Sequence, residues 1–260
     1  MSDFYNNPWF HVRRPAPGAS LRLFCFPYAG GSANIYAEWA QWLPADIEVL
    51  ALQYPGRGNR FGEPLISSCR ELVAALMPQI RAFVGKPFAF FGHSNGGLVS
   101  FELARALQRA GNTFQVHHFI SGKRAIHLPR TRRITYNLPE EEFRQELESL
   151  GGTPAELLAN RDLMDMYLPV LRADFAVGEA YSYSEGALLN CNATLFGGMD
   201  DVDVPLADVL RWSELIQGHV DHVCLPGNHF FINSQARKIV EIVSNRLTQA
   251  LRGVPAHYAA

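Results

Sequence analysis

The sequence lacks the features that mark several large classes of protein. Its net charge is only −2 at pH 7, whereas chains that bind nucleic acids are usually strongly basic. Its longest apolar runs are strand-length, far below the roughly 20 residues of a membrane span. Residues 1–5 have neither the basic start nor the apolar stretch of a signal peptide. We therefore expect a cytoplasmic protein with no nucleic-acid partner and no membrane partner.

Cysteine is also scarce. The four cysteines lie far apart, and no two of them form a C-x-x-C pair. Disulfide frameworks and structural metal sites need clustered or regularly spaced cysteines. The sequence therefore predicts reduced, mostly buried thiols and no metal site. The residues concerned are Cys25, Cys69, Cys191 and Cys224.

What the chain does have is enough apolar sequence for one large core. It has 260 residues, 48% of them hydrophobic, and α/β folds of this size are often one domain. Strand-like and helix-like segments alternate, which is typical of a mostly parallel sheet covered by helices on both faces. We predict a single α/β domain over residues 1–260. The expected strands are 21–26, 48–52, 88–91, 114–120, 193–196 and 222–225, and the expected helices are 70–84, 98–107 and 235–251.

Residues 125–185 break this alternation, because they contain helix signals but no convincing strand. Pro139 and three glutamates that follow it begin one helix. Residues 153–156 form a capping box that opens a second helix. A third is expected over 162–175, interrupted by Pro169. We interpret residues 125–185 as a helical lid insertion over a pocket; the alternative is a packing subdomain that does not move.

The most informative motif is residues 92–96, Gly-His-Ser-Asn-Gly, directly after the apolar run 87–91. The pattern G-x-S-x-G is weak alone, but between a strand and a helix it indicates a nucleophile elbow. The turn holds Ser94 in a strained backbone conformation that exposes its hydroxyl. Gly92 and Gly96 leave room for the strand and helix to approach closely. This arrangement predicts an α/β-hydrolase fold with Ser94 as the nucleophile.

A serine nucleophile needs a base, and the base needs a carboxylate that orients it. In α/β-hydrolases these residues follow the serine in the order acid, then histidine. His229 fits the base, since it lies in a loop after the last expected strand. Asp200, Asp201 and Asp203 all follow the strand 193–196 and qualify as the acid. We choose Asp201, with Asp200 as the alternative.

The reaction also needs backbone N–H groups that stabilise the oxyanion. One donor is the residue after the nucleophile, Asn95. The second is expected in the loop 26–32 after the first strand, and we choose Ala29. The pair Gly30-Gly31 in that loop has a simpler interpretation as a plain turn.

Six motifs in order make the chain similar to a known family. From about Leu21 to Leu251 it resembles the type II thioesterases, the stand-alone editing enzymes of nonribosomal peptide and polyketide synthesis. It departs from them at Asn95, where Met or Leu is common, and at Gly97, where Ala is frequent. The family usually has its acid at the position of Asp201. The motifs are 26–32, 53–58, 92–96, 150–154, 171–175 and 226–231.

The resemblance implies hydrolysis of acyl thioesters on the phosphopantetheine arm of acyl or peptidyl carrier proteins. It implies that stalled or misprimed acyl groups are removed and that no cofactor is needed. We also expect the protein to be a monomer. Three other functions stay open. These are a general esterase for small oxygen esters, an acyltransferase, and a non-catalytic protein that binds carrier domains.

A basic cluster precedes the predicted insertion helices. It consists of Lys123, Arg124, Arg130, Arg132 and Arg133. Since carrier domains are typically acidic, this cluster is a candidate docking surface. The alternative is an ordinary solvated surface with local ion pairs.

Overall fold

The computed structural model describes residues 5–253; residues 1–4 and 254–260, the two ends of the predicted domain, lie outside the described residues. A seven-stranded sheet runs through the described chain in the order β1-β3-β2-β4-β5-β6-β7. Only β1 is antiparallel to its neighbour. The predicted mostly parallel sheet is therefore confirmed. The strands are β1 (Phe10–His11), β2 (Leu21–Phe26), β3 (Ile47–Leu52), β4 (Phe88–His93), β5 (Gln115–Ser121), β6 (Asn192–Gly198) and β7 (Val220–Leu225).

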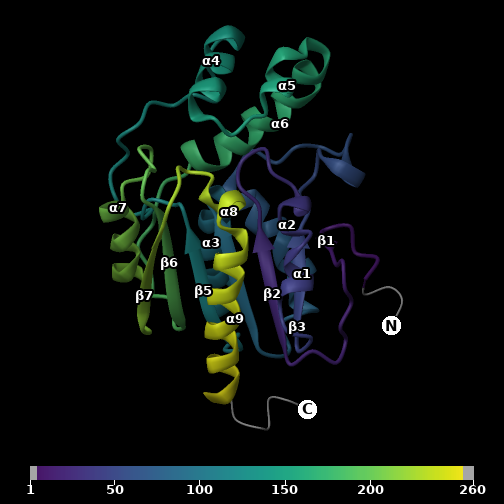
Figure 1. Cartoon of the computed structure of the whole chain (residues 1–260), viewed down its shortest axis with the longest axis vertical. Helices are drawn as coiled ribbons and strands as arrows, with labels where there is room; N and C mark the ends of the chain where they lie inside the picture. The colour runs from purple at the N-terminus through teal and green to yellow at the C-terminus, as the bar shows by residue number, and fades with distance from the viewer. Residues whose placement is uncertain (1–4, 254–260) are drawn as a thin grey trace.

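Helices cover both faces of the sheet (Figure 1). In β2, Leu21 and Leu23 pack into the core under α1 (Trp39–Trp42) and α9 (Ala236–Gly253). Phe24 and Phe26 pack into the core under α2 (Cys69–Arg81) and α3 (Asn95–Arg109). Side chains alternate across a strand, so a strand that is buried along its whole length contributes side chains to two cores. Every residue of β2 is buried, as such a position requires.

The predicted insertion lies between β5 and β6 and is helical. It contains α4 (Glu140–Leu150), α5 (Ala155–Ala159) and α6 (Arg161–Glu179). Figure 1 shows α4 and α5 beyond one end of the sheet, whereas α6 runs back to that end and contacts α3. They share a small core of their own, formed by Phe143, Leu147, Met164, Leu168 and Leu171.

One detail of the insertion differs from the prediction. Pro169 does not interrupt the third helix, since α6 continues from Arg161 to Glu179. Proline removes one helical hydrogen bond, to the carbonyl four residues earlier. Pro169 and Asp165 are both exposed, so water can satisfy that carbonyl. Packing of Leu168 and Leu171 into the insertion core then keeps the helix continuous.

The remaining elements are short and were not predicted. Strand β1 has two residues, and the helical turns have three to five. They are η1 (Ala33–Tyr36), η2 (Gly58–Arg60), α7 (Leu206–Leu210), η3 (Arg211–Leu215) and α8 (Phe231–Ser234). All four cysteines are free, and three are buried, as predicted. Within residues 5–253, no helix has the length and apolarity to cross a bilayer.

Candidate active site

The turn at Ser94 has the strained geometry that the motif predicts. Ser94 has φ 52° and ψ −120°, and it is the only non-glycine residue with positive φ among those described. A Cβ on Gly92 would lie 2.3 Å from the Gly96 carbonyl oxygen, and one on Gly96 would lie 2.1 Å from the Phe26 carbonyl oxygen. Both glycines are therefore needed for β4, α3 and the end of β2 to approach one another.

The structure brings His229 together with one of the three candidate aspartates. His229 Nδ1 lies 2.7 Å from Asp201 Oδ2. The second oxygen, Oδ1, accepts the backbone N–H groups of Asp203 and Val204 at 3.1 and 2.9 Å. The Asp201 side chain is only 1% exposed. It therefore holds the imidazole in a fixed orientation from a site that water scarcely reaches.

The other two aspartates have different partners. Asp200 is exposed and accepts the backbone N–H of Gly227 at 3.1 Å. The carboxylate of Asp203 pairs with Arg132 at 2.8 Å. The geometry therefore favours Asp201 as the acid, as we chose from the sequence, over Asp200.

His93, inside the elbow, contacts the backbone of His229 and the side chain of Ser121. Its Nδ1 lies 2.9 Å from Ser121 Oγ, and its Nε2 lies 2.9 Å from the backbone carbonyl oxygen of His229. Because that carbonyl can only accept, Nε2 carries the proton and Nδ1 accepts from the serine hydroxyl. Burial, followed by the nearby His229, lowers the pKa of His93 well below its usual range.

The two amides chosen for the oxyanion hole both border the pocket that contains Ser94. Asn95 begins α3, and the first N–H groups of a helix have no acceptor within the helix. Ala29 lies in a turn that the N–H of Gly31 closes on the carbonyl of Tyr28 at 2.9 Å. Within residues 5–253, neither the Ala29 nor the Asn95 backbone N–H has a hydrogen-bond acceptor. Both are therefore available to a bound anion.

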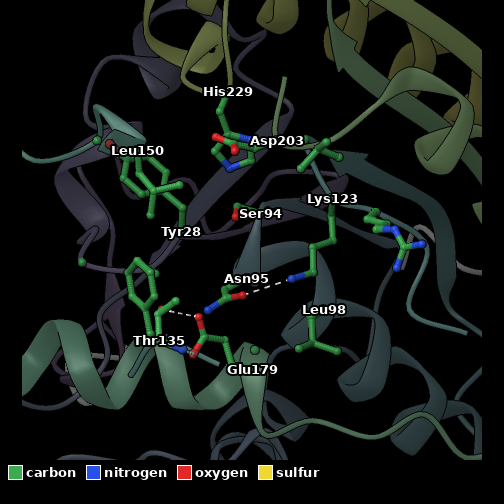
Figure 2. Close-up of a pocket in the computed structure, with 18 of the residues that line it drawn as sticks. Tyr28, Ser94, Asn95, Leu98, Lys123, Thr135, Leu150, Glu179, Asp203 and His229 are labelled. Atoms are coloured by element: carbon green, nitrogen blue, oxygen red, sulfur yellow. Dashed lines mark hydrogen bonds between the residues drawn. The ribbon is translucent and has the colours of Figure 1, made fainter. Parts of the chain in front are cut away.

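The pocket has a volume of about 860 Å³, large enough for a ligand of substantial size. Ser94 and His229 line it together with Tyr28, Leu171 and Phe175. Figure 2 shows Ser94 between His229 on one side and Asn95 on the other. In the described structure no hydrogen bond joins the Ser94 hydroxyl to His229; this contact is often loose in proteins without substrate.

Lys123 turns into this pocket instead of joining an exposed basic surface. Its Nζ donates to Asn95 Oδ1 at 3.2 Å (Figure 2). Burial lowers the pKa of Lys123 to about 8, against smaller effects from Cys69 and Glu179 that raise it. The polar side chain of Asn95, the departure from the family pattern, thus has a defined partner in the site.

The rest of the basic cluster is mostly engaged in ion pairs. Arg124 pairs with Asp208 at 2.6 Å. Arg132 and Arg133 both pair with Glu146 of α4, at 3.0 and 3.3 Å. These three local pairs match the alternative interpretation of the cluster. A role in docking stays a prediction, supported by the position of these arginines at the pocket.

Two residues next to the site were not identified as site residues from the sequence. Arg57 and Asp174 form a buried ion pair, with Nη1–Oδ2 at 2.5 Å and Nη2–Oδ1 at 2.7 Å. Asp174 also accepts the N–H of Gly30, in the loop of the predicted oxyanion donor, at 2.7 Å. The available signal was their position inside two of the six motifs, 53–58 and 171–175.

Side chains that commonly hold metals do not gather in this site. Within residues 5–253, no group of three or more His, Cys, Asp or Glu side chains is placed to hold a metal ion. The contacts that surround Ser94 are instead those of nucleophilic catalysis: an oriented imidazole and open backbone amides.

Comparison with known proteins agrees with the resemblance seen in the sequence. The thioesterase domain family matches residues 21–247. The chain is 38% identical over 245 residues to the gramicidin S biosynthesis protein GrsT of Aneurinibacillus migulanus, covering 94% of this chain and 96% of that protein. It is 35% identical over 251 residues to thioesterase PikA5 of Streptomyces venezuelae, covering 95% and 88%. The structure of the type II thioesterase BorB, from the borrelidin biosynthetic cluster, matches with a TM-score of 0.85 at 35% identity, covering 93% of this chain and 98% of that one.

Proposed function

This chain belongs to the thioesterase family, and from that premise we propose that it is a type II thioesterase. It hydrolyses acyl thioesters on the phosphopantetheine arm of carrier proteins in nonribosomal peptide or polyketide synthesis. Its role is to remove stalled or misprimed acyl groups. The observation that carries the proposal is the buried Asp201–His229 hydrogen bond at 2.7 Å beside a strained Ser94 in one pocket.

The first half-reaction transfers the acyl group to the enzyme. His229 Nε2 takes the proton of Ser94 as Oγ attacks the thioester carbonyl, and the charged oxygen is held by the N–H groups of Ala29 and Asn95. The carbon–sulfur bond then breaks. The thiolate leaves on the carrier arm and takes the proton from His229, so the products are the acyl-serine and the free carrier thiol.

The second half-reaction returns the enzyme to its starting state. Water enters the pocket, gives a proton to His229 and attacks the ester carbonyl of acyl-Ser94. The same two amides hold the oxyanion. The bond to Ser94 Oγ breaks, the proton returns to Oγ, and the free acid leaves. Asp201 stabilises the imidazolium in both halves, and these steps use side chains and backbone amides of this chain together with water.

The insertion at 125–185 acts in this proposal as a lid over the entry of the carrier arm. Its helix α6 contributes Tyr167, Leu171 and Phe175 to the pocket wall, so a movement of α6 changes the shape of the substrate channel. The exposed arginines of the basic cluster, Arg130, Arg132 and Arg133, are the proposed docking surface for an acidic carrier domain. The protein works as a monomer in the cytoplasm, within the single domain 1–260.

The test is release of acid from an acetyl-loaded carrier protein, followed by intact-mass spectrometry. Wild-type protein should release acetate, and Ser94→Ala should not. Ser100→Ala is a matched control, because Ser100 is a buried serine of α3, the helix that follows Ser94, and its hydroxyl bonds Gly97 and His118. Release by the Ser94→Ala variant would contradict the assigned nucleophile. Faster cleavage of a small oxygen ester than of the carrier thioester would favour the general esterase instead.

A further inference from the structure

Asp174 of α6 contacts both segments that carry the predicted oxyanion donors. Its Oδ2 accepts the N–H of Gly30, the residue after Ala29, at 2.7 Å. Its backbone carbonyl accepts Nδ2 of Asn95, the residue after Ser94, at 2.7 Å. Gly30 and Asn95 lie 144 and 79 positions from Asp174 in the sequence. A single residue of the insertion therefore touches both sides of the oxyanion hole.

Arg57 holds the Asp174 carboxylate in place. The two side chains form a bidentate pair and are 3% and 8% exposed. Arg57 Nη1 also donates to the Gly31 carbonyl at 3.0 Å, in the same loop as Gly30. Burial alone would lower the pKa of Arg57, but Asp174 outweighs it and the pKa is raised. Since bidentate pairs fix geometry as well as charge, the carboxylate has little freedom to turn away from Gly30.

Two glycines allow α6 to lie this close to the hole. Gly30 has φ +75°, and a Cβ there would be 2.6 Å from Leu171 Cδ2 of α6. A Cβ on Gly178 of α6 would be 2.3 Å from Asn95 Oδ1. Helix and hole are therefore packed against each other on both sides of Asp174.

We propose that Asp174, held by Arg57, is a positioning residue for the oxyanion hole. The anchored N–H of Gly30 fixes the turn 28–31 and so the direction of the Ala29 N–H. An oxyanion donor must lie within about 3 Å of the charged oxygen, so a small rotation of this turn weakens it. Because Asp174 belongs to the insertion, displacement of α6 changes transition-state stabilisation. The identity of the natural substrate rests on the proposed function, but the experiment below does not depend on that substrate.

Single substitutions are poor tests, because removing one partner leaves a buried charge unpaired. Two double variants avoid this. Arg57→Met with Asp174→Leu removes both charges and the acceptor for Gly30. Arg57→Met with Asp174→Asn also removes both charges, but keeps a carbonyl oxygen that can accept the Gly30 N–H. The two proteins differ at residue 174 alone, where one side chain offers an acceptor to Gly30 and the other does not.

The readouts are kcat and KM on a small acyl thioester, and the rate at which a fluorophosphonate modifies Ser94. In the second reaction the Oγ–P bond forms, fluoride leaves, and the serine proton is lost to solvent through His229. It uses the oxyanion hole whatever the natural substrate is. Loss of a whole oxyanion donor costs about 10²–10³ in kcat, so the Leu-containing variant should lose at least about tenfold, with KM changed less than about threefold. The Asn-containing variant should recover most of that loss.

Arg22→Met with Glu48→Leu is the matched control. This buried pair, 3.0 Å apart, lies at the opposite end of β2 and β3 from the active site. The control should lower the melting temperature and leave kcat of the folded protein unchanged.

Equal kcat and phosphonylation rates in wild type and the folded Leu-containing variant would overturn the proposal. Equal losses in both double variants would overturn it too. If wild type released no acid from a carrier thioester, the proposed function would fail, while the phosphonylation rates would still decide the role of Asp174.

Discussion

Replacing Asp201 with asparagine should abolish most activity without unfolding the protein, because the hydrogen bonds of Asp201 fix the orientation of the new amide. Oδ1 of Asp201 accepts two backbone N–H groups, from Asp203 and Val204. In Asp201→Asn the amide oxygen must occupy that position, because an NH₂ group would face two donors. The NH₂ group therefore faces His229 Nδ1 and donates to it.

This reversal puts the imidazole in the wrong tautomer. With Nδ1 accepting, the proton is on Nε2, which then cannot take the proton of Ser94. Serine-hydrolase triads lose about 10⁴ in kcat from such a change, which corresponds to about 5 kcal/mol of transition-state stabilisation. We expect a loss of that size in kcat on an acyl thioester, with a melting temperature close to that of wild type.

The neighbouring aspartate is the control. Asp200→Asn makes the same chemical change, but the Asp200 carboxylate is exposed and accepts the Gly227 N–H instead of contacting His229. Its kcat should stay within about threefold of wild type, as is usual for exposed sites. If Asp201→Asn keeps more than a tenth of the activity, or if Asp200→Asn loses as much as Asp201→Asn, then Asp201 does not orient His229 as described.

Three further perturbations test other parts of the structure. Reversing the charges of Arg130, Arg132 and Arg133 to Glu should raise KM for a loaded carrier protein but not for a small thioester; equal effects on both would contradict docking. Gly96→Ala should destabilise the fold by about 1–3 kcal/mol and lower kcat, since its Cβ would lie 2.1 Å from a backbone oxygen; a wild-type melting temperature would contradict this. Lys123→Met should be more stable than wild type at pH 7, and this difference should shrink as pH rises from 8 toward 10.5, because the folded pKa near 8 lies below the unfolded value. A difference in unfolding free energy that does not vary with pH would show that Lys123 is not desolvated.

The sequence was most informative where local chemistry decides the structure. The elbow at Ser94 could be predicted because strand, strained turn and helix are adjacent in the chain. The sheet strands could be predicted because a strand buried on both faces is mostly apolar, as β2 is at every position except Arg22. The helices of the insertion could be located from residues near their first turns, such as Pro139. The helix break expected at Pro169 was wrong, because the exposure of Asp165 depends on the tertiary structure.

The sequence was least informative where contacts join distant segments. Arg57 and Asp174 are 117 residues apart, and nothing local to either of them indicates the other. The choice between Asp200 and Asp201 depends on which of two adjacent side chains the loop after β6 turns toward His229, and the spacing of residues in the sequence does not determine this. The inward turn of Lys123 likewise depends on Asn95, a partner supplied by a different element.

The buried His93 has a consequence for how the pH dependence of activity should be interpreted. Two imidazoles lie side by side in this site, with ring centroids 5.2 Å apart. Because His93 donates one ring proton to the His229 carbonyl and its pKa lies well below the usual range, it is neutral at neutral pH. Although two imidazoles lie in the site, His93 therefore adds no ionisation of its own to the acidic side of a rate profile.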